Sequence, residues 1–181
     1  PALGATQPLQ CVLGAAAEAM EDDGKDTSPC RRLSGLARAG DAEGMRAHLQ
    51  QLMNTIGRDA TAHVITTSDF GDRGSQSVLH TAAVKGQASI MRMLLEARAP
   101  VDACDDPGNT PLHYACERGG ARVAWLLLEG GADAVAKNNF GRTPRHFVGI
   151  NSWDTERVKE GKGCIARMLE AGHSQFEFEA L

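Results

Sequence analysis

The chain has 181 residues, of which 42% are hydrophobic and 4% aromatic, and its formal net charge is −4 at pH 7. That length fits one domain or one short array of repeats with a real core. The acidic balance, and basic runs no longer than Arg31-Arg32, argue against nucleic-acid binding, which needs a basic patch. No stretch approaches the ~20 apolar residues that a membrane-spanning helix needs. Neither a nucleic-acid partner nor a membrane span is therefore expected.

The five cysteines, at positions 11, 30, 104, 116 and 164, follow no regular spacing. They form neither a Cys-x-x-Cys pair nor a set of Cys and His ligands, so the sequence predicts free thiols and no metal site. Free thiols fit the cytoplasm or another reducing compartment. A disulfide between Cys11 and Cys30 stays open.

The first residue is Pro1, and the N-terminus lacks the charged and apolar regions of a secretory signal. Loss of an initiator Met, cleavage of an organelle-targeting peptide and trimming of the sequence all fit this start. The sequence does not separate the three.

An extension, residues 1–27, precedes the regular part of the chain. Its apolar residues recur at the spacing of one helix face: Leu9, Val12, Leu13, Ala16 and Met20. Two interpretations of this short amphipathic helix stay open. It either covers the end of the fold or docks onto a partner.

A helix pair follows over residues 28–53. Ser28 is a good N-cap and Pro29 fits the first helical position, so one helix starts here, and Gly40 ends it. The second helix runs from Asp41 to about Met53, with its apolar residues on one face.

Residues 54–76 interrupt this pattern. The stretch 61–67 has strand-like residues, and the stretch 69–74 is rich in turn residues. We expect an insertion on the exposed edge of the fold, which is a common place for binding.

A repeated tetrapeptide marks the rest of the chain. Thr110-Pro111-Leu112-His113 returns as Thr143-Pro144-Arg145-His146 and, more weakly, as Ser77-Val78-Leu79-His80. The histidines are 33 residues apart in both intervals, and a fixed period of this length indicates a stack of small repeats. The predicted helix pairs are 77–85 with 88–97, 110–118 with 121–129, and 143 to about 150 with about 160 to 171.

The residues of one repeat have separate physical roles. Thr110 caps a helix with its hydroxyl, and Pro111 fits the first helical position because that N–H has no helical partner. Leu112 enters the core. Ala115 and Cys116 are small, so the neighbouring layer of helices can approach closely.

These residues resemble the ankyrin repeat. Beyond the tetrapeptide, the resemblance rests on Tyr114-Ala115, Gly119, Val123, Leu127-Leu128-Glu129 and Gly131-Ala132-Asp133. It implies an all-α solenoid of stacked antiparallel helix pairs with protruding β-hairpin fingers, one of which turns near 138–141. The implied domain spans 28–173, with a degenerate capping repeat at 28–53, the insertion at 54–76, repeats at 77–109, 110–142 and 143–173, and then a tail at 174–181.

The resemblance gives His80, His113 and His146 a structural role, because in this family the histidine braces the finger by hydrogen bonds. One histidine per layer forms a ladder and does not converge on a metal ion. The sequence also has neither a phosphate-binding glycine loop nor a nucleophile–base set. We therefore expect no catalysis, no cofactor and no small-molecule substrate.

Departures from the ankyrin pattern are candidates for function. Arg145 replaces the core leucine and is expected to face solvent at the end of the stack. Trp125 stands where the pattern has an exposed polar residue on the convex face; it is either covered by the chain itself or an anchor for a partner. The tail alternates Phe and Glu at 176–179. It folds back as a strand, covers the last helix, or is a linear motif for a partner.

The resemblance implies a non-enzymatic protein–protein interaction module, an adaptor or scaffold that binds its partner on the concave face. Carried over by position, the candidate contacts on the fingers are Asp105, Asp106, Pro107, Asn109, Asn138, Asn139, Phe140 and Arg142. Those on the inner helices are Thr81, Lys85, Tyr114, Glu117, Arg118 and Phe147, with Trp125 added from the convex face. The alternative is a permanent peripheral subunit of a large complex, organellar or membrane-associated, held by the extensions, the insertions and the convex face.

Overall fold

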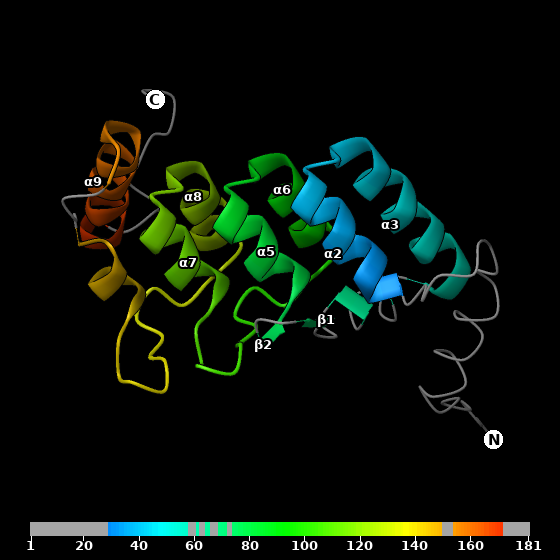
Figure 1. The fold of residues 1–181 in the computed structure, drawn as a ribbon, viewed down its shortest axis with the longest axis horizontal. Helices are drawn as coiled ribbons and strands as arrows, with labels where there is room; N and C mark the ends of the chain where they lie inside the picture. Colours follow the sequence, from blue (N-terminus) through cyan, green and yellow to red (C-terminus); the bar gives the residue numbers. More distant parts are fainter. Residues whose placement is uncertain are drawn as a thin grey trace, which may run out of the picture.

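The computed structural model describes residues 29–57, 61, 64–65, 69–71, 74–149 and 154–171. Within them, helices stack side by side as a row of antiparallel pairs (Figure 1). Three predictions concern residues outside this set: the helix within 1–27, the disulfide between Cys11 and Cys30, and the fold of the tail at 174–181.

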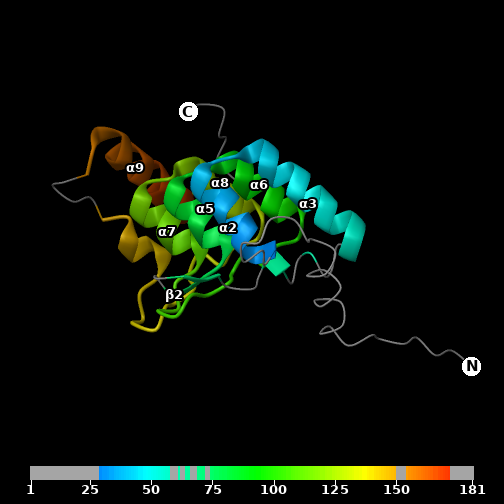
Figure 2. The same cartoon turned by 45° about the vertical axis from the view of Figure 1, so that its right-hand side comes forward.

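Two rows of helices build the stack. The first row consists of α2 (Pro29–Ala39), α5 (Val78–Lys85), α7 (Pro111–Arg118) and the 3₁₀ helix η1 (Pro144–Phe147). The second row consists of α3 (Ala42–Ile56), α6 (Ala88–Glu96), α8 (Ala121–Glu129) and α9 (Glu156–Ala171). Helices pack on their neighbours in the same row and on their partner in the other row. The loops that join successive pairs project to one side of both rows (Figure 2). The predicted all-α solenoid is confirmed.

Glycines in the left-handed region separate the two helices of a pair. Gly86 ends α5 with φ 68°, and Gly119 ends α7 with φ 67°. A side chain at these positions would strain the backbone, whereas glycine adopts this conformation without cost. The chain therefore reverses within two residues, and the second helices start at Ala88 and Ala121.

The core uses the same position in successive repeats. Leu33 of α2, Leu79 of α5 and Leu112 of α7 are fully buried. Ala115 and Cys116 of α7 are also fully buried, so the layers approach closely as expected. Burial of one leucine side chain contributes about 1.5–3 kcal/mol, which makes this column a main source of stability.

The insertion after α3 differs from the prediction. Thr61, Val64 and Ile65 have helical backbone and are buried, whereas their composition favoured a strand at the exposed edge. Their i, i+3, i+4 spacing places all three on one helix face, and burial of that face outweighs the strand propensity of β-branched residues. Part of the insertion therefore belongs to the core.

Strands occur later in the insertion, within the segment that was predicted as turn-rich. β1 (Asp69–Gly71) pairs antiparallel with β2 (Gly74–Gln76), and Phe70 stands opposite Ser75. β2 leads directly into α5, so the pair takes the place of a finger in front of that helix.

The last repeat also differs from the prediction. The helix expected from Thr143 to about Ile150 is limited to η1, and α9 begins at Glu156 instead of about Glu160. At the core-leucine position Arg145 is exposed, as predicted, and its guanidinium pairs with Glu170 of α9 at 2.6 Å. This position supplies no apolar side chain to the core, so little packing stabilises a longer helix.

α9 crosses the turn between α7 and α8 at close range. A Cβ on Gly161 would clash with the carbonyl oxygen of Gly119. Just after this contact, Lys162 is buried and its ammonium bonds to the carboxylate of Asp154 and to the carbonyl of Gly149, both at 2.9 Å. The contact of Gly161 fixes the first half of α9 against the preceding repeat, and the bonds of Lys162 fix it to the loop before α9.

Candidate functional site

A histidine in each of two repeats ties that repeat to the following finger. The first finger is the loop 98–109 and the second finger the loop 131–142. His80 Nδ1 accepts from the N–H and the hydroxyl of Ser77, at 3.1 and 2.8 Å, and its Nε2 donates to the carbonyl of Asn109 at 2.9 Å. His113 makes the same contacts with Thr110, at 3.0 and 2.9 Å, and with the carbonyl of Arg142 at 3.1 Å.

These partners fix the protonation state of both rings. A backbone N–H only donates and a carbonyl only accepts, so Nδ1 is unprotonated and Nε2 carries the proton. Burial is the main cause that lowers the pKa of His80 and of His113, although the bonds to the finger carbonyls oppose it. Both rings are therefore neutral at pH 7 and have no free nitrogen for a metal ion or a substrate proton.

A buried side chain holds the turn of each finger. In the first finger, Asp105 Oδ1 accepts from the N–H of Asn109 at 2.6 Å. In the second finger, Asn138 Oδ1 accepts from the N–H groups of Phe140 and Arg142 at 3.0 and 2.9 Å. Asp and Asn favour turns because their side chains satisfy nearby backbone donors in this way.

The two fingers are also bonded to each other. The N–H of Asn139 donates to the carbonyl of Pro107 at 3.1 Å, and its side-chain amide donates to the carbonyl of Asp106 at 2.9 Å. The amide of Asn138 donates to the side-chain oxygen of Asn109 at 2.8 Å. Neighbouring fingers thus form a ladder with defined positions for the exposed side chains.

Aromatic side chains of the first row take part in the same ladder. The hydroxyl of Tyr114 donates to Asp105 at 2.6 Å and accepts from Gln76 at 3.2 Å. The rings of Tyr114 and His80 form a T-shaped pair with centroids 5.8 Å apart. Burial raises the pKa of Tyr114, so its hydroxyl stays a donor. Phe147 makes the equivalent contact with His113, at 5.4 Å.

The comparisons with known proteins agree with this geometry. A family model described as ankyrin repeats, in three copies, matches residues 39–138, more than half of the chain. The chain belongs to the ankyrin-repeat family. A search of the curated proteins finds no match. Ankyrin repeats are generally non-enzymatic protein–protein interaction modules, so the family gives the class of function and leaves the partner open.

The ankyrin ladder divides the candidate contacts that the sequence indicated. One group makes bonds or ring contacts inside the chain: Asp105, Asn109, Tyr114, Asn138 and Phe147. A second group is exposed: Lys85, Asp106, Pro107, Glu117, Arg118, Asn139, Phe140 and Arg142. Asn139 belongs to both groups, since its side-chain amide bonds to the carbonyl of Asp106. Thr81 and Trp125 are half-buried. Position in the repeat alone does not distinguish the two groups, because the internal bonds depend on the neighbouring finger.

Phe140 stands out in the exposed group. It lies at the tip of the second finger, and 75% of its surface is exposed. Trp125, by contrast, is only partly exposed and packs against the core, so it is not the freely exposed aromatic that its place in the pattern suggested.

Val135 of the second finger was not among the candidates, although 72% of its surface is exposed. The sequence contained a signal for it. Val135 follows Asp102 by one period of 33 residues, and Asp102 is a polar residue whose carboxylate accepts from the N–H of Asp133 at 3.1 Å. Asp102 bonds to the following finger, whereas Val135 at the equivalent position is an exposed apolar residue.

Other kinds of site find no support in the part of the chain that the structure describes. There, no group of His, Cys, Asp and Glu is placed to hold a metal ion, and no helix is long and apolar enough to cross a membrane. Cys104, Cys116 and Cys164 are free thiols. Burial raises the pKa of Cys116 to about 12, so this thiol is not a nucleophile at pH 7.

Proposed function

We propose that this protein is a non-enzymatic adaptor whose partner lies against the finger tips and the first row of helices. The observation that carries the proposal is the exposure of Phe140, 75%, on a finger whose turn is held by the hydrogen bonds of Asn138. An exposed aromatic on a rigid support loses little conformational entropy on binding, and such residues commonly dominate the energy of an interface.

Charged side chains of the first row extend this surface. Lys85 is exposed at the end of α5, and Glu117 and Arg118 are exposed at the end of α7. An apolar anchor surrounded by polar and charged groups is the usual composition of a protein interface. No equivalent observation favours the permanent subunit, which relied on Trp125, on the insertions and on extensions that lie outside the described residues.

The test uses side chains that have no role in the ladder. Tyr114→Ala is unsuitable, because it removes the bonds to Asp105 and Gln76. Proteins retained from a cell extract by the immobilised chain are identified, and the affinity of each is measured for Phe140→Ser, for Lys85→Ser with Arg118→Ser, and for the control Arg92→Ser on the second row.

We expect Phe140→Ser to weaken binding by about tenfold or more, the double variant to weaken it less, and the control to bind as the unsubstituted chain does. Melting temperatures should stay unchanged, since all four side chains are exposed. A partner with the same affinity for all variants would reject this surface.

A further inference from the structure

Among the described residues, the second finger is the last one of the ladder. Its outer side carries the positions that correspond to the contacts between the first and the second finger. Between the two fingers, three groups face the second finger and bond to its backbone. They are the carboxylate of Asp102 with the N–H of Asp133, the carbonyl of Pro107 with the N–H of Asn139, and Nε2 of His113 with the carbonyl of Arg142.

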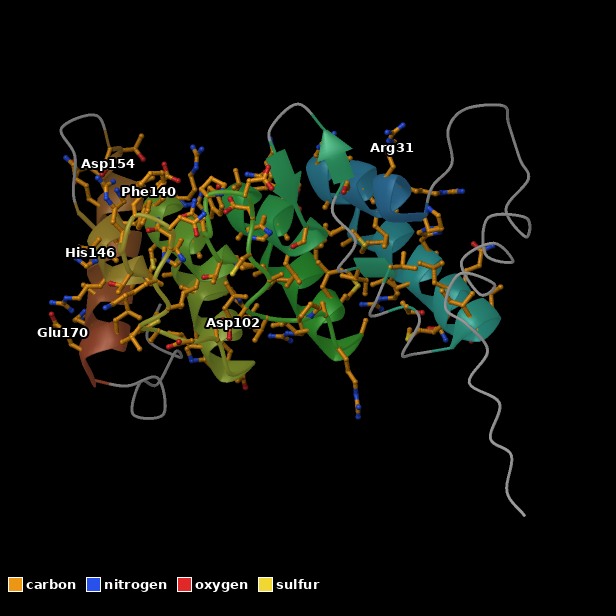
Figure 3. The ribbon with its side chains drawn as sticks, turned by 90° about the horizontal axis from the view of Figure 1, so that it is seen from below. Arg31, Asp102, Phe140, His146, Asp154 and Glu170 are labelled. Carbon is orange, nitrogen blue, oxygen red and sulfur yellow. The ribbon has the colours of Figure 1, made fainter. Side chains whose placement is uncertain are left out.

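The equivalent positions one period later are Val135, Phe140 and His146. We call these three residues the end face. Val135 and Phe140 are the two large hydrophobic residues that are exposed among the described residues, at 72% and 75%. Figure 3 shows Phe140 and His146 at the end of the stack where α9 lies.

His146 is prepared for a bond like that of His113. Its Nδ1 accepts from the N–H and the hydroxyl of Thr143 at 3.0 and 2.8 Å, as in the other repeats. Its Nε2 has no hydrogen-bond partner among the described residues. With Nδ1 occupied as an acceptor, the proton of the neutral ring lies on Nε2, so the end face offers one directed donor.

We propose that the end face binds an extended segment of a partner protein, about ten residues long, that carries acidic and apolar side chains. The length follows from residues 133–142, which supply all three bonds in the equivalent interface. The segment accepts a bond from His146 Nε2 with a main-chain carbonyl, donates an N–H to the carbonyl of Phe140, and covers Val135. Exposed backbone edges are commonly paired with an extended segment in this way.

Charge favours an acidic segment over a second copy of the chain. Lys137 and Arg142 are exposed on the second finger, which also carries Val135 and Phe140 of the end face. The acidic residue of this finger, Asp133, accepts a bond from the N–H of Val135. Two copies meeting at this face would bring like charges together, whereas an acidic segment gains a favourable interaction.

This inference concerns a different surface from the first-row helices of the proposed function, and Val135 and His146 distinguish the two. The probe is a synthetic peptide with the sequence of residues 172–181, which alternates Phe and Glu. It is titrated into the isotope-labelled full chain carrying Phe176→Ser and Phe178→Ser, so that the chain's own copy of the motif is removed, and the shifts are followed by NMR.

We expect saturable shifts at the His146 ring and at the backbone of residues 135–140. Val135→Ser should weaken binding by about tenfold, because it removes the covered apolar group. A peptide with Lys at both Glu positions should not bind. Lys85→Ser with Arg118→Ser should bind as before.

Four results would overturn the proposal. The first is the absence of shifts at about 1 mM peptide. The second is binding that depends on Lys85 and Arg118 but not on Val135, which places the peptide on the first-row surface. The third is binding only after substitution of the tail, which assigns the end face to the chain's own tail. The fourth is a concentration-dependent shift of these signals without peptide, which assigns it to a second copy.

Discussion

The repeat interface at α7 and the end of the stack at η1 contain the same tetrapeptide in different surroundings. At α7, Leu112 and His113 are buried; at η1, the equivalent Arg145 and His146 are exposed. Both copies form the same capping box between the Thr and the His. The motif therefore sets the local cap at both places, whereas the burial of its side chains differs between them.

The largest difference in the free energy of unfolding is expected at the core-leucine position, between substitutions of Leu112 and of Arg145. Leu112→Ala should destabilise the chain by about 2–5 kcal/mol, because it leaves a cavity in a packed layer. Arg145→Ala should change stability by less than about 1 kcal/mol, since its ion pair with Glu170 is more than half exposed. Denaturant unfolding of both variants measures the difference. Equal losses would show that the two positions do not differ in packing as the structure indicates.

A second difference in stability is expected between substitutions of two glycines of α9, Gly161 and Gly163. Gly161→Ala should destabilise by about 1–3 kcal/mol, because its Cβ would clash with the carbonyl of Gly119 across the helix interface. Gly163→Ala has no atom within 4 Å of the added Cβ and should stabilise by about 0.5–1 kcal/mol through helix propensity. Thermal unfolding compares them. A stabilising Gly161→Ala would mean that α9 does not approach the α7–α8 turn closely.

The buried histidines make the free energy of unfolding decrease in acid. Burial lowers the pKa of His80 and His113 below the ordinary value of 6.5, and it also lowers the pKa of His48. The unfolded chain then binds more protons than the folded chain below pH 6.5. The contribution of His80 and His113 to the free energy of unfolding is full above pH 6.5. It decreases as the pH falls toward the pKa values of these histidines in the folded chain.

Urea midpoints at about pH 7.5 and about pH 5.5 measure this decrease. His113→Gln should be less stable than the unsubstituted chain at both pH values and should show a smaller decrease between them. A variant with the same pH dependence as the unsubstituted chain would exclude His113 as a source of acid sensitivity.

The smallest effect is expected at Arg98, the first residue of the first finger. Its φ is 60°, and the equivalent first residue of the second finger is Gly131 with φ 90°. Arg98→Gly should stabilise by about 0.5–1 kcal/mol, because glycine adopts this backbone conformation without the clash of a Cβ. Gly131→Arg is the matched change in the opposite direction. A loss of stability in Arg98→Gly would show that the Arg side chain contributes more than the strain removes.

Local signals in the sequence were sufficient for much of the fold. The cap at Thr110, the start at Pro111, the core position of Leu112 and the turn near Gly141 each depend on neighbouring residues. Short-range preferences and a fixed period determine such features, so the sequence predicts them.

Features that depend on distant residues were predicted poorly. The internal bonds of Tyr114 were not predicted: its hydroxyl bonds to Gln76, 38 positions away, and to Asp105. The helical backbone at Val64 and Ile65 depends on burial against the core, and η1 is short because only Pro144 of this helix is buried. The exposure of Val135 was also missed, because its contrast with Asp102 becomes informative only when the bonds between fingers are known.

The tautomers of the repeated histidines test the central claim, that these rings brace each finger in the neutral form with the proton on Nε2. Long-range ¹H–¹⁵N correlation NMR of the full chain at neutral pH measures them directly. We expect His80 and His113 to be Nε2–H tautomers whose ring protons exchange slowly with water, because they bond to the carbonyls of Asn109 and Arg142. We expect the ring proton of His146 to exchange faster. An Nδ1–H tautomer, or fast exchange at His80 and His113, would contradict the account.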